Sequence, residues 1–289
     1  MGTSWKQLAV FVFIAAAGAI CAASPCAAQG MSGGRQAVPG ATSTDMQQTE
    51  LHELTDVQRQ PGVKIDSKEQ SAYDAFYRVN SELADKKIQL GNAFLEKYPT
   101  SIFAEAVDAG MVNAYYAKQD WKGFYSTADK ALALKPDDVD VLTSVGWVIP
   151  HFFNPQDEDA DQQLSKAESY EKRALQALGA MPKPARLTEA QFAASKAEKT
   201  IQAHSALGLV YFRRADYAGS AAEIQQSMQN NPNPDPTDLY VLGVDLRNLN
   251  KFSDAAEAFA RCAQVSGNLQ DRCKQAADEA KVQAAQPKQ

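Results

Sequence analysis

Residues 205–217 read SALGLVYFRRADY, and residues 240–252 read YVLGVDLRNLNKF. The pair Leu207-Gly208 in the first stretch returns as Leu242-Gly243 in the second, 35 residues later. A recurrence at this distance is typical of chains built from repeated pairs of helices. The two stretches therefore predict an all-α fold in which each helical pair buries its apolar face against the next pair.

Further residues of the same kinds follow both pairs. After the first come Tyr211, Tyr217, Ala221, Ile224 and Pro232, and after the second come Leu246, Phe252, Ala255, Ala256 and Phe259. In these residues the chain resembles the tetratricopeptide repeat (TPR) family, whose unit of about 34 residues carries such a pattern. The resemblance implies a right-handed superhelix of helical hairpins, with 201–234 and 236–269 as the clearest units.

Two earlier segments, 105–138 and 139–182, resemble the unit less closely. The first contains Met111, Trp121 and Pro136, and the second begins with Val145-Gly146 but is interrupted by about nine extra residues near 150–159. Residues 72–83 and 86–99 are expected to form one more helical hairpin, either a divergent repeat or a cap, and 269–284 a polar capping helix of the kind that solenoids require. The expected repeat domain thus spans residues 67–286.

A segment without repeat features, 187–203, separates the second and third units. Thr188 and Gln191 have the spacing of a capping box, in which two side chains satisfy the free amides at the start of a helix. We expect a helix that begins there and continues into the helix containing Leu207, with Phe192 and Ile201 facing the stack.

The first 28 residues have the pattern of a secretory signal peptide. Lys6 precedes an apolar run, Leu8 to Ile20, and small residues lead to a cleavage site after Ala28. The alternative is an uncleaved membrane anchor, because a span needs roughly 20 apolar residues. Residues 29–66, which contain few large apolar side chains, are expected to be a disordered linker. The expected location is the periplasm or outside the cell.

Cleavage after Ala28 leaves Cys262 and Cys273 in the mature chain. Their separation of 11 residues suits a disulfide between adjacent helices, which persists in an oxidising compartment. Closing so short a loop contributes roughly 2–3 kcal/mol of stability. The alternative is a pair of small buried thiols at helix interfaces.

Acidic residues outnumber basic ones, 35 to 29, which gives a formal net charge of -6. Because nucleic-acid binding needs a clustered basic surface, we expect no nucleic-acid partner. Membrane contact is expected only through residues 1–28, if they remain attached.

No short motif of a hydrolase, zinc enzyme or nucleotide-binding enzyme occurs, and His52, His151 and His204 are scattered. We therefore expect neither catalysis nor a cofactor.

Four carboxylates have the spacing of ligands in a calcium-binding loop: Asp157, Asp159, Asp161 and Glu168. Gln162 stands where such a loop needs glycine. The same residues also suit the start of a helix, where carboxylates stabilise the positive end of the helix dipole. We favour the helix start and expect no metal site.

In TPR proteins, fixed positions on the first helix of each unit face a bound peptide. The resemblance implies a groove here that combines aromatic rings, amides and two arginines, side chains that suit an extended peptide. Its expected residues are Asn113, Tyr116, Trp147, His151, Gln202, Phe212, Arg213, Tyr240, Arg247 and Asn248. For each of them, packing or a solvated position is the alternative. Ser205 and Leu209 replace the Lys and Asn of the family's carboxylate clamp, so no clamp is expected.

The sequence therefore predicts an exported, non-catalytic scaffold that binds a peptide or protein in the groove of a helical solenoid. The alternative is a structural subunit of a cell-envelope complex or homo-oligomer, assembled through its outer face and capping helix.

Overall fold

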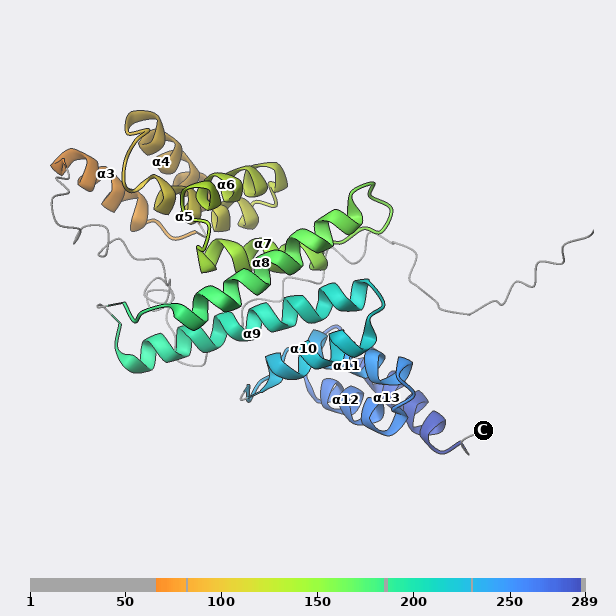
Figure 1. The fold of residues 1–289 in the computed structure, drawn as a ribbon. Coiled ribbons are helices and arrows are strands. Elements are labelled where there is room, and N and C mark those ends of the chain that lie inside the picture. The colour runs from red at the N-terminus through yellow and green to blue at the C-terminus, as the bar shows by residue number, and fades with distance from the viewer. Residues whose placement is uncertain (1–65, 82, 185–186, 230, 287–289) are drawn as a thin grey trace, which may run out of the picture. The chain divides into compact units, whose positions relative to one another are not determined.

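The computed structural model describes residues 66–81, 83–184, 187–229 and 231–286. Within these residues the chain forms eleven helices and no strand (Figure 1), which confirms the all-α class predicted from the sequence. The expected signal peptide and all but the last residue of the expected linker lie outside the described residues. The helices are α3 (Ser67–Tyr77), α4 (Ala84–Lys97), α5 (Ala104–Ala117), α6 (Trp121–Leu134), α7 (Val139–His151), α8 (Ala160–Ala180), α9 (Glu189–Arg213), α10 (Tyr217–Met228), α11 (Pro236–Asn248), α12 (Phe252–Gln264) and α13 (Gln270–Ala284).

The helices are arranged as a series of hairpins. Each helix packs against the next one along the chain, and α7 also packs against both α5 and α9. The buried apolar residues form separate clusters, and the three largest lie within α3–α5, within α5–α9 and within α9–α13. A core divided in this way is what a helical-hairpin solenoid requires, because each hairpin buries its apolar face against its neighbours.

The two repeated glycines occupy equivalent surroundings. A Cβ atom added to Gly208 would lie 2.5 Å from Cδ1 of Ile224, and one added to Gly243 would lie 2.5 Å from Cε1 of Phe259. Each glycine thus lets the second helix of its hairpin place a bulky side chain directly against the first helix. The recurrence seen in the sequence is therefore a recurrence of packing.

The interrupted unit has the same contact with a longer connection. Gly146 on α7 lies against the side chain of Glu171 on α8, which follows it by 25 residues, whereas Ile224 follows Gly208 by 16. The difference of nine residues corresponds to the insertion expected near 150–159. In the structure α7 ends at His151 and α8 begins at Ala160, so part of the insertion lengthens the loop between these helices and the rest lengthens the start of α8.

Helix α9 begins with the capping box predicted at Thr188. The backbone amide of Gln191 donates to Thr188 Oγ1 at 3.2 Å, and the amide of Thr188 donates to Gln191 Oε1 at 3.0 Å. The helix then continues without a break to Arg213, as expected. Phe192 packs beside the buried cluster formed by Val139, Leu178 and Leu187.

Three hairpin turns share an unusual backbone conformation. Gln119, Ala215 and Asn250 have φ values of 56°, 58° and 59°, in the left-handed region that ends many helices. Each lies in the turn between the first and second helix of a hairpin. The turn between α7 and α8, which carries the insertion, has no residue of this kind among those described.

The last two helices are joined covalently. Cys262 on α12 and Cys273 on α13 form a disulfide, with their Cα atoms 5.7 Å apart. Both residues are fully buried. Of the two alternatives drawn from the sequence, the structure thus contains the bridge.

Candidate functional site

The ten residues expected to line a groove lie on the first helices of four hairpins, α5, α7, α9 and α11. The structure does not bring them together as one set. One group forms an aromatic surface, a second group ties α9 to α7, and a third lies beside the capping helix α13.

The aromatic group spans α5, α6 and α7. The ring centroid of Trp147 lies 6.2 Å from that of Tyr116 and 3.8 Å from that of His151. Trp121, at the start of α6, lies 6.0 Å from Tyr116 and 4.7 Å from Phe152. We call these five residues the aromatic row. Phe152 is 48% exposed, and the other four are half-buried.

Two members of the aromatic row were not among the expected groove residues. Trp121 begins the second helix of its hairpin, and Phe152 lies in the insertion, for which a repeat of fixed length has no position. The run His151-Phe152-Phe153 next to an interrupted unit could have indicated Phe152 as a binding residue. Aromatic side chains in an inserted loop are a common feature of binding sites.

His151 is neutral at physiological pH in this arrangement. Its Nδ1 atom lies 2.7 Å from the carbonyl oxygen of Trp147. Burial lowers the pKa of His151 to about 4, and the hydrogen bond to that carbonyl acts in the opposite direction. The imidazole therefore extends the apolar ring surface rather than adding a charge.

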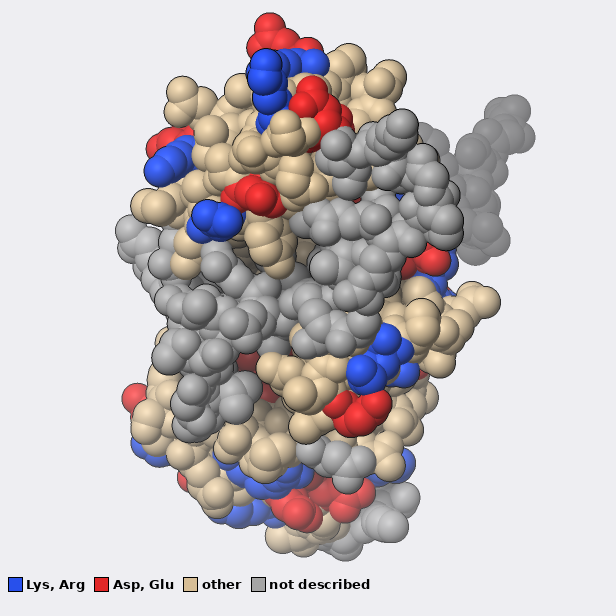
Figure 2. All heavy atoms as spheres, turned by 90° about the vertical axis from the view of Figure 1, so that its left-hand side faces the viewer, with Lys and Arg blue, Asp and Glu red and all other residues tan. Residues whose placement is uncertain are grey.

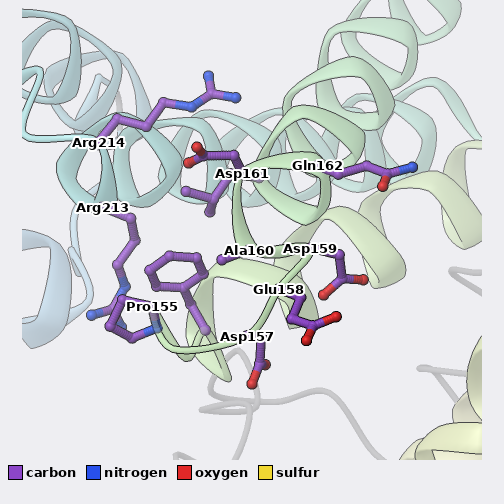
Figure 3. A pocket seen from close by; sticks show the side chains of 11 residues that line it. Pro155, Asp157, Glu158, Asp159, Ala160, Asp161, Gln162, Arg213 and Arg214 are labelled. Atoms are coloured by element: carbon purple, nitrogen blue, oxygen red, sulfur yellow. The ribbon is translucent and has the colours of Figure 1, made fainter.

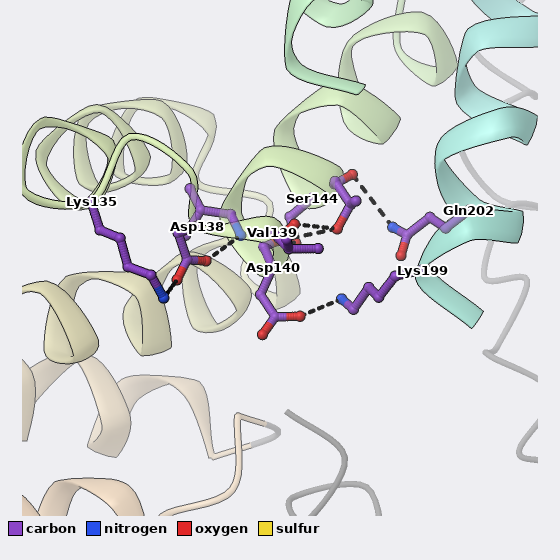
Figure 4. A network of polar contacts seen from close by, with 9 residues as sticks. Lys135, Asp138, Val139, Asp140, Ser144, Lys199 and Gln202 are labelled. Atoms are coloured by element: carbon purple, nitrogen blue, oxygen red, sulfur yellow. Dashed lines mark hydrogen bonds and ion pairs between the residues drawn. The ribbon is translucent and has the colours of Figure 1, made fainter. Parts of the chain in front are cut away.

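The second group consists of Gln202 and Arg213, which bind the backbone of α7. Gln202 Nε2 donates to the carbonyl of Thr143 at 3.4 Å, and Arg213 Nε donates to the carbonyl of Pro150 at 3.1 Å. Figure 4 shows the first of these contacts beside the ion pair between Lys199 and Asp140, whose charged atoms are 2.7 Å apart. These side chains hold two neighbouring first helices together.

The third group consists of Tyr240 and Arg247, which face α13. The guanidinium carbon of Arg272 lies 5.1 Å from the ring centroid of Tyr240. Arg247 Nη1 lies 3.7 Å from Glu279 Oε2. The capping helix thus engages two side chains that were expected to contact a partner.

The remaining expected residues are Asn113, Phe212 and Asn248. Asn113 is half-buried on α5, and the ring of Phe212 lies 6.3 Å from that of Tyr217. Asn248 is exposed, and its Nδ2 donates to the carbonyl of Val244 on the same helix at 2.8 Å. The aromatic row is therefore the largest group that the structure assembles from the expected positions.

An open pocket of about 750 Å³ lies where the inserted loop meets the end of α9 (Figure 3). Phe153 and Pro155 contribute apolar surface, and the guanidinium carbon of Arg213 lies 5.8 Å from the ring centroid of Phe153. In Figure 3 the side chains of Asp157, Glu158 and Asp159 project from the outer edge of the loop, on the side opposite Arg214. The acidic lining residues are Asp157, Glu158, Asp159 and Asp161.

The carboxylates of the calcium-like pattern do not converge. Helix α8 begins at Ala160 with Asp161 in its first turn, which confirms the helix start. Glu168 points to other partners: its oxygens accept from Lys172 Nζ at 2.6 Å, from the Tyr211 hydroxyl at 3.1 Å and from Arg214. These bonds, the one from Lys172 foremost, lower the pKa of Glu168 to about 2. Among the described residues, no group of three His, Cys, Asp or Glu side chains could hold a metal ion.

Several buried acids were not singled out in the sequence. Asp238 accepts from the hydroxyls of Ser205 at 2.7 Å and Ser227 at 2.8 Å, and Asp245 accepts from Ser220 at 2.6 Å. Burial raises the pKa of Asp238 to about 6 and that of Asp245 to about 7. Ser205 thus connects α9 to α11.

Comparisons with known proteins find a structural similarity and no sequence match. No family model matches the chain, and no curated protein sequence matches it. Among solved structures, the chain is similar to a thermophilic TPR protein of Thermus thermophilus, with a TM-score of 0.45 and 12% sequence identity. That similarity covers 74% of this chain and 99% of the other. Within the described residues, no helix combines the length and the apolar character needed to cross a membrane.

Proposed function

We propose that this chain is an exported scaffold without catalytic activity, which binds an extended segment of another protein on the side formed by the first helices of its hairpins. The observation that carries the proposal is the aromatic row. Tyr116, Trp121 and Trp147 come from three neighbouring helices, and none of these rings is fully buried. Large, rigid and partly exposed rings are the side chains that contribute most to binding energy.

The ties between α7 and α9 support the same proposal. Gln202, Arg213 and Lys199 join the two helices through backbone and carboxylate groups of α7. Such ties hold the first helices in a fixed spacing, so a bound segment meets a preformed surface and less conformational entropy is lost on binding.

The charge distribution favours a protein partner over a nucleic acid. On the face shown in Figure 2, basic and acidic side chains alternate over the described residues, and neither sign forms a continuous area. The formal net charge of the whole chain is -6. A nucleic-acid partner would need a clustered basic surface that releases counterions from phosphates.

Export is the part of the proposal that depends on residues 1–28. Cleavage after Ala28 predicts that the mature protein begins at Gln29, and the disulfide between Cys262 and Cys273 suits an oxidising compartment. Intact mass and N-terminal sequencing of protein recovered from the periplasm and the medium test this. Full-length protein confined to the cytoplasm would contradict it.

The binding role is tested with Trp147→Ala and a matched control, Gln225→Ala, on the exposed side of α10. Each variant is immobilised and exposed to a random peptide library and to the cell-envelope fraction. We expect Trp147→Ala to lose the peptides and proteins that the original chain and the control retain, without a change of size on a gel-filtration column. Capture that survives Trp147→Ala but is lost after changes on the outer face or α13 would instead indicate the structural subunit.

A further inference from the structure

The aromatic row leads into the inserted loop. It ends at His151 and Phe152, and the next residue, Phe153, lines the pocket between the loop and α9. None of these side chains is charged at neutral pH, because burial keeps His151 neutral. A partner that follows the rings toward the loop therefore meets an apolar, aromatic surface.

The loop at the end of this surface carries an excess of negative charge. Asp157 accepts from Asn154 Nδ2 at 2.7 Å and Asp159 accepts from Gln163 Nε2 at 2.6 Å, so their described partners are neutral amides. Glu158 and Asp161 form no ion pair with any other described residue.

The two arginines of the pocket do not neutralise these carboxylates. Arg214 is engaged by Glu168 and by Ser165 Oγ, the latter at 2.9 Å. Arg213 donates to the carbonyl of Pro150 and lies over Phe153. Negative charge therefore remains in the pocket that the ring of Phe153 also lines.

We propose that the segment bound here is an extended peptide in which proline stands beside lysine or arginine, a proposal that rests on the function proposed above. The prolines lie on the rings of the aromatic row, and the basic side chains reach the carboxylates of Asp157, Glu158 and Asp159.

Proline suits the rings for two reasons. A proline-rich segment already adopts the extended polyproline II conformation, so it loses little entropy on binding. Its pyrrolidine rings present flat apolar faces, which aromatic-lined surfaces accept. The carboxylates select the flanking residues, since opposite charge accelerates association and like charge excludes acidic segments.

The test uses fluorescently labelled synthetic peptides of equal length. The probe consists of repeated Ala-Pro-Pro-Lys units, and two comparison peptides replace its prolines by alanine or its lysines by glutamate. We expect the probe to bind at least about tenfold more tightly than either comparison peptide, because each substitution removes one of the two recognition elements.

Variants of the protein test separately the contact of the prolines with the rings and the contact of the basic side chains with the carboxylates. Phe152→Ala, at an exposed position, is expected to weaken the probe about tenfold. The double variant Asp157→Asn with Asp159→Asn is expected to lower the affinity for the probe about three- to tenfold at low salt. The affinity for the glutamate peptide should stay the same or rise in this variant, because a repulsion between like charges is removed. Glu257→Gln, on the exposed side of α12, is the matched control and should change nothing.

The outcomes distinguish this inference from the proposed function. If the library selects peptides that depend on Trp147 but are not enriched in proline and basic residues, the inference is wrong and the binding role stands. Equal binding of the three synthetic peptides also overturns it. If no peptide of any composition binds, the proposed function itself fails.

Discussion

The carboxyl group of Glu171 lies against the Cα atom of Gly146, in the place that the side chain of Ile224 occupies beside Gly208. Glu171 is fully buried, and both of its oxygens lack a hydrogen-bond partner in the structure. Burial raises its pKa well above the usual range, while the positive charge of Lys199 acts in the opposite direction. Lys199 itself pairs with Asp140. An acid thus occupies a core position that the clearest repeat units fill with an apolar side chain.

Replacing this acid by an apolar residue should stabilise the protein. We expect Glu171→Leu to raise the free energy of unfolding at pH 8 by about 1–3 kcal/mol, because a buried carboxyl group without a hydrogen-bond partner is removed. The reciprocal change, Ile224→Glu, should lower it by at least about 3 kcal/mol. Urea unfolding followed by circular dichroism measures both. A destabilised Glu171→Leu protein would show that this carboxyl group has a stabilising partner.

Stability should fall as the pH rises from about 4 to about 7. Burial raises the pKa of Asp238 to about 6 and of Asp245 to about 7, so the folded state holds protons that the unfolded state has already lost. His151 opposes this trend: its pKa is lowered to about 4, so its contribution is present above about 6.5 and is lost as the pH falls through 4. Burial also raises the pKa of Asp108, to about 6, and that of Glu171, so both act in the same direction as Asp238 and Asp245. With these four buried acids against one histidine, we expect a lower free energy of unfolding at pH 8 than at pH 5.

Asp245→Asn checks the origin of this dependence. The amide cannot ionise, and its oxygen still accepts the hydrogen bond that Ser220 donates. The difference between the free energies of unfolding at pH 5 and pH 8 should therefore shrink in this variant. An exposed acid, in Asp254→Asn, serves as the control. The same pH dependence in Asp245→Asn and the original chain would contradict the assignment.

The left-handed turn at Ala215 predicts a stabilising glycine substitution. Because glycine adopts positive φ without steric strain, Ala215→Gly should raise the free energy of unfolding by about 0.5–1 kcal/mol. Ala222→Gly, within α10 and exposed, should lower it by about 1 kcal/mol through its poorer helix propensity. Thermal unfolding of the two variants in parallel measures the contrast. Equal effects at both positions would argue against the turn conformation.

The disulfide should contribute measurably to the stability of the last hairpin. Replacing Cys262 and Cys273 together by serine is expected to lower the free energy of unfolding by about 2–3 kcal/mol, since the unfolded chain loses a covalent constraint. Reductant should destabilise the original chain and leave this variant unaffected. Intact-mass measurement before and after reduction checks the bond directly, and two free thiols in the unreduced protein would disprove it.

Much of the fold was predictable because its determinants are local. The Leu207-Gly208 and Leu242-Gly243 pairs mark close helix contacts, and the spacing of Thr188 and Gln191 specifies where α9 begins. The insertion before α8 could likewise be counted from the repeat length. Each of these features depends on residues that are near in sequence, so the pattern of residue types carries the information.

The expected groove stays a prediction, and the contacts of its residues could not be predicted from the sequence. Fixed repeat positions assigned its ten residues to the first helices of four hairpins, and in the structure Gln202 and Arg213 bind α7, while Arg247 pairs with Glu279 of α13. A repeat position states which side of a helix a residue occupies. It does not state how close the next helix lies or which of its groups accepts a bond.

The sequence by itself determined the all-α class, the helical hairpins, the glycine contacts and the cap of α9, because periodicity and short spacing specify them. Only the tertiary structure decided that Trp121 and Phe152 join Tyr116 and Trp147 in one aromatic row, and that Glu171 is buried beside Gly146. Those relationships depend on the distance and angle between helices, which result from the packing of many side chains together and leave no short pattern in the chain.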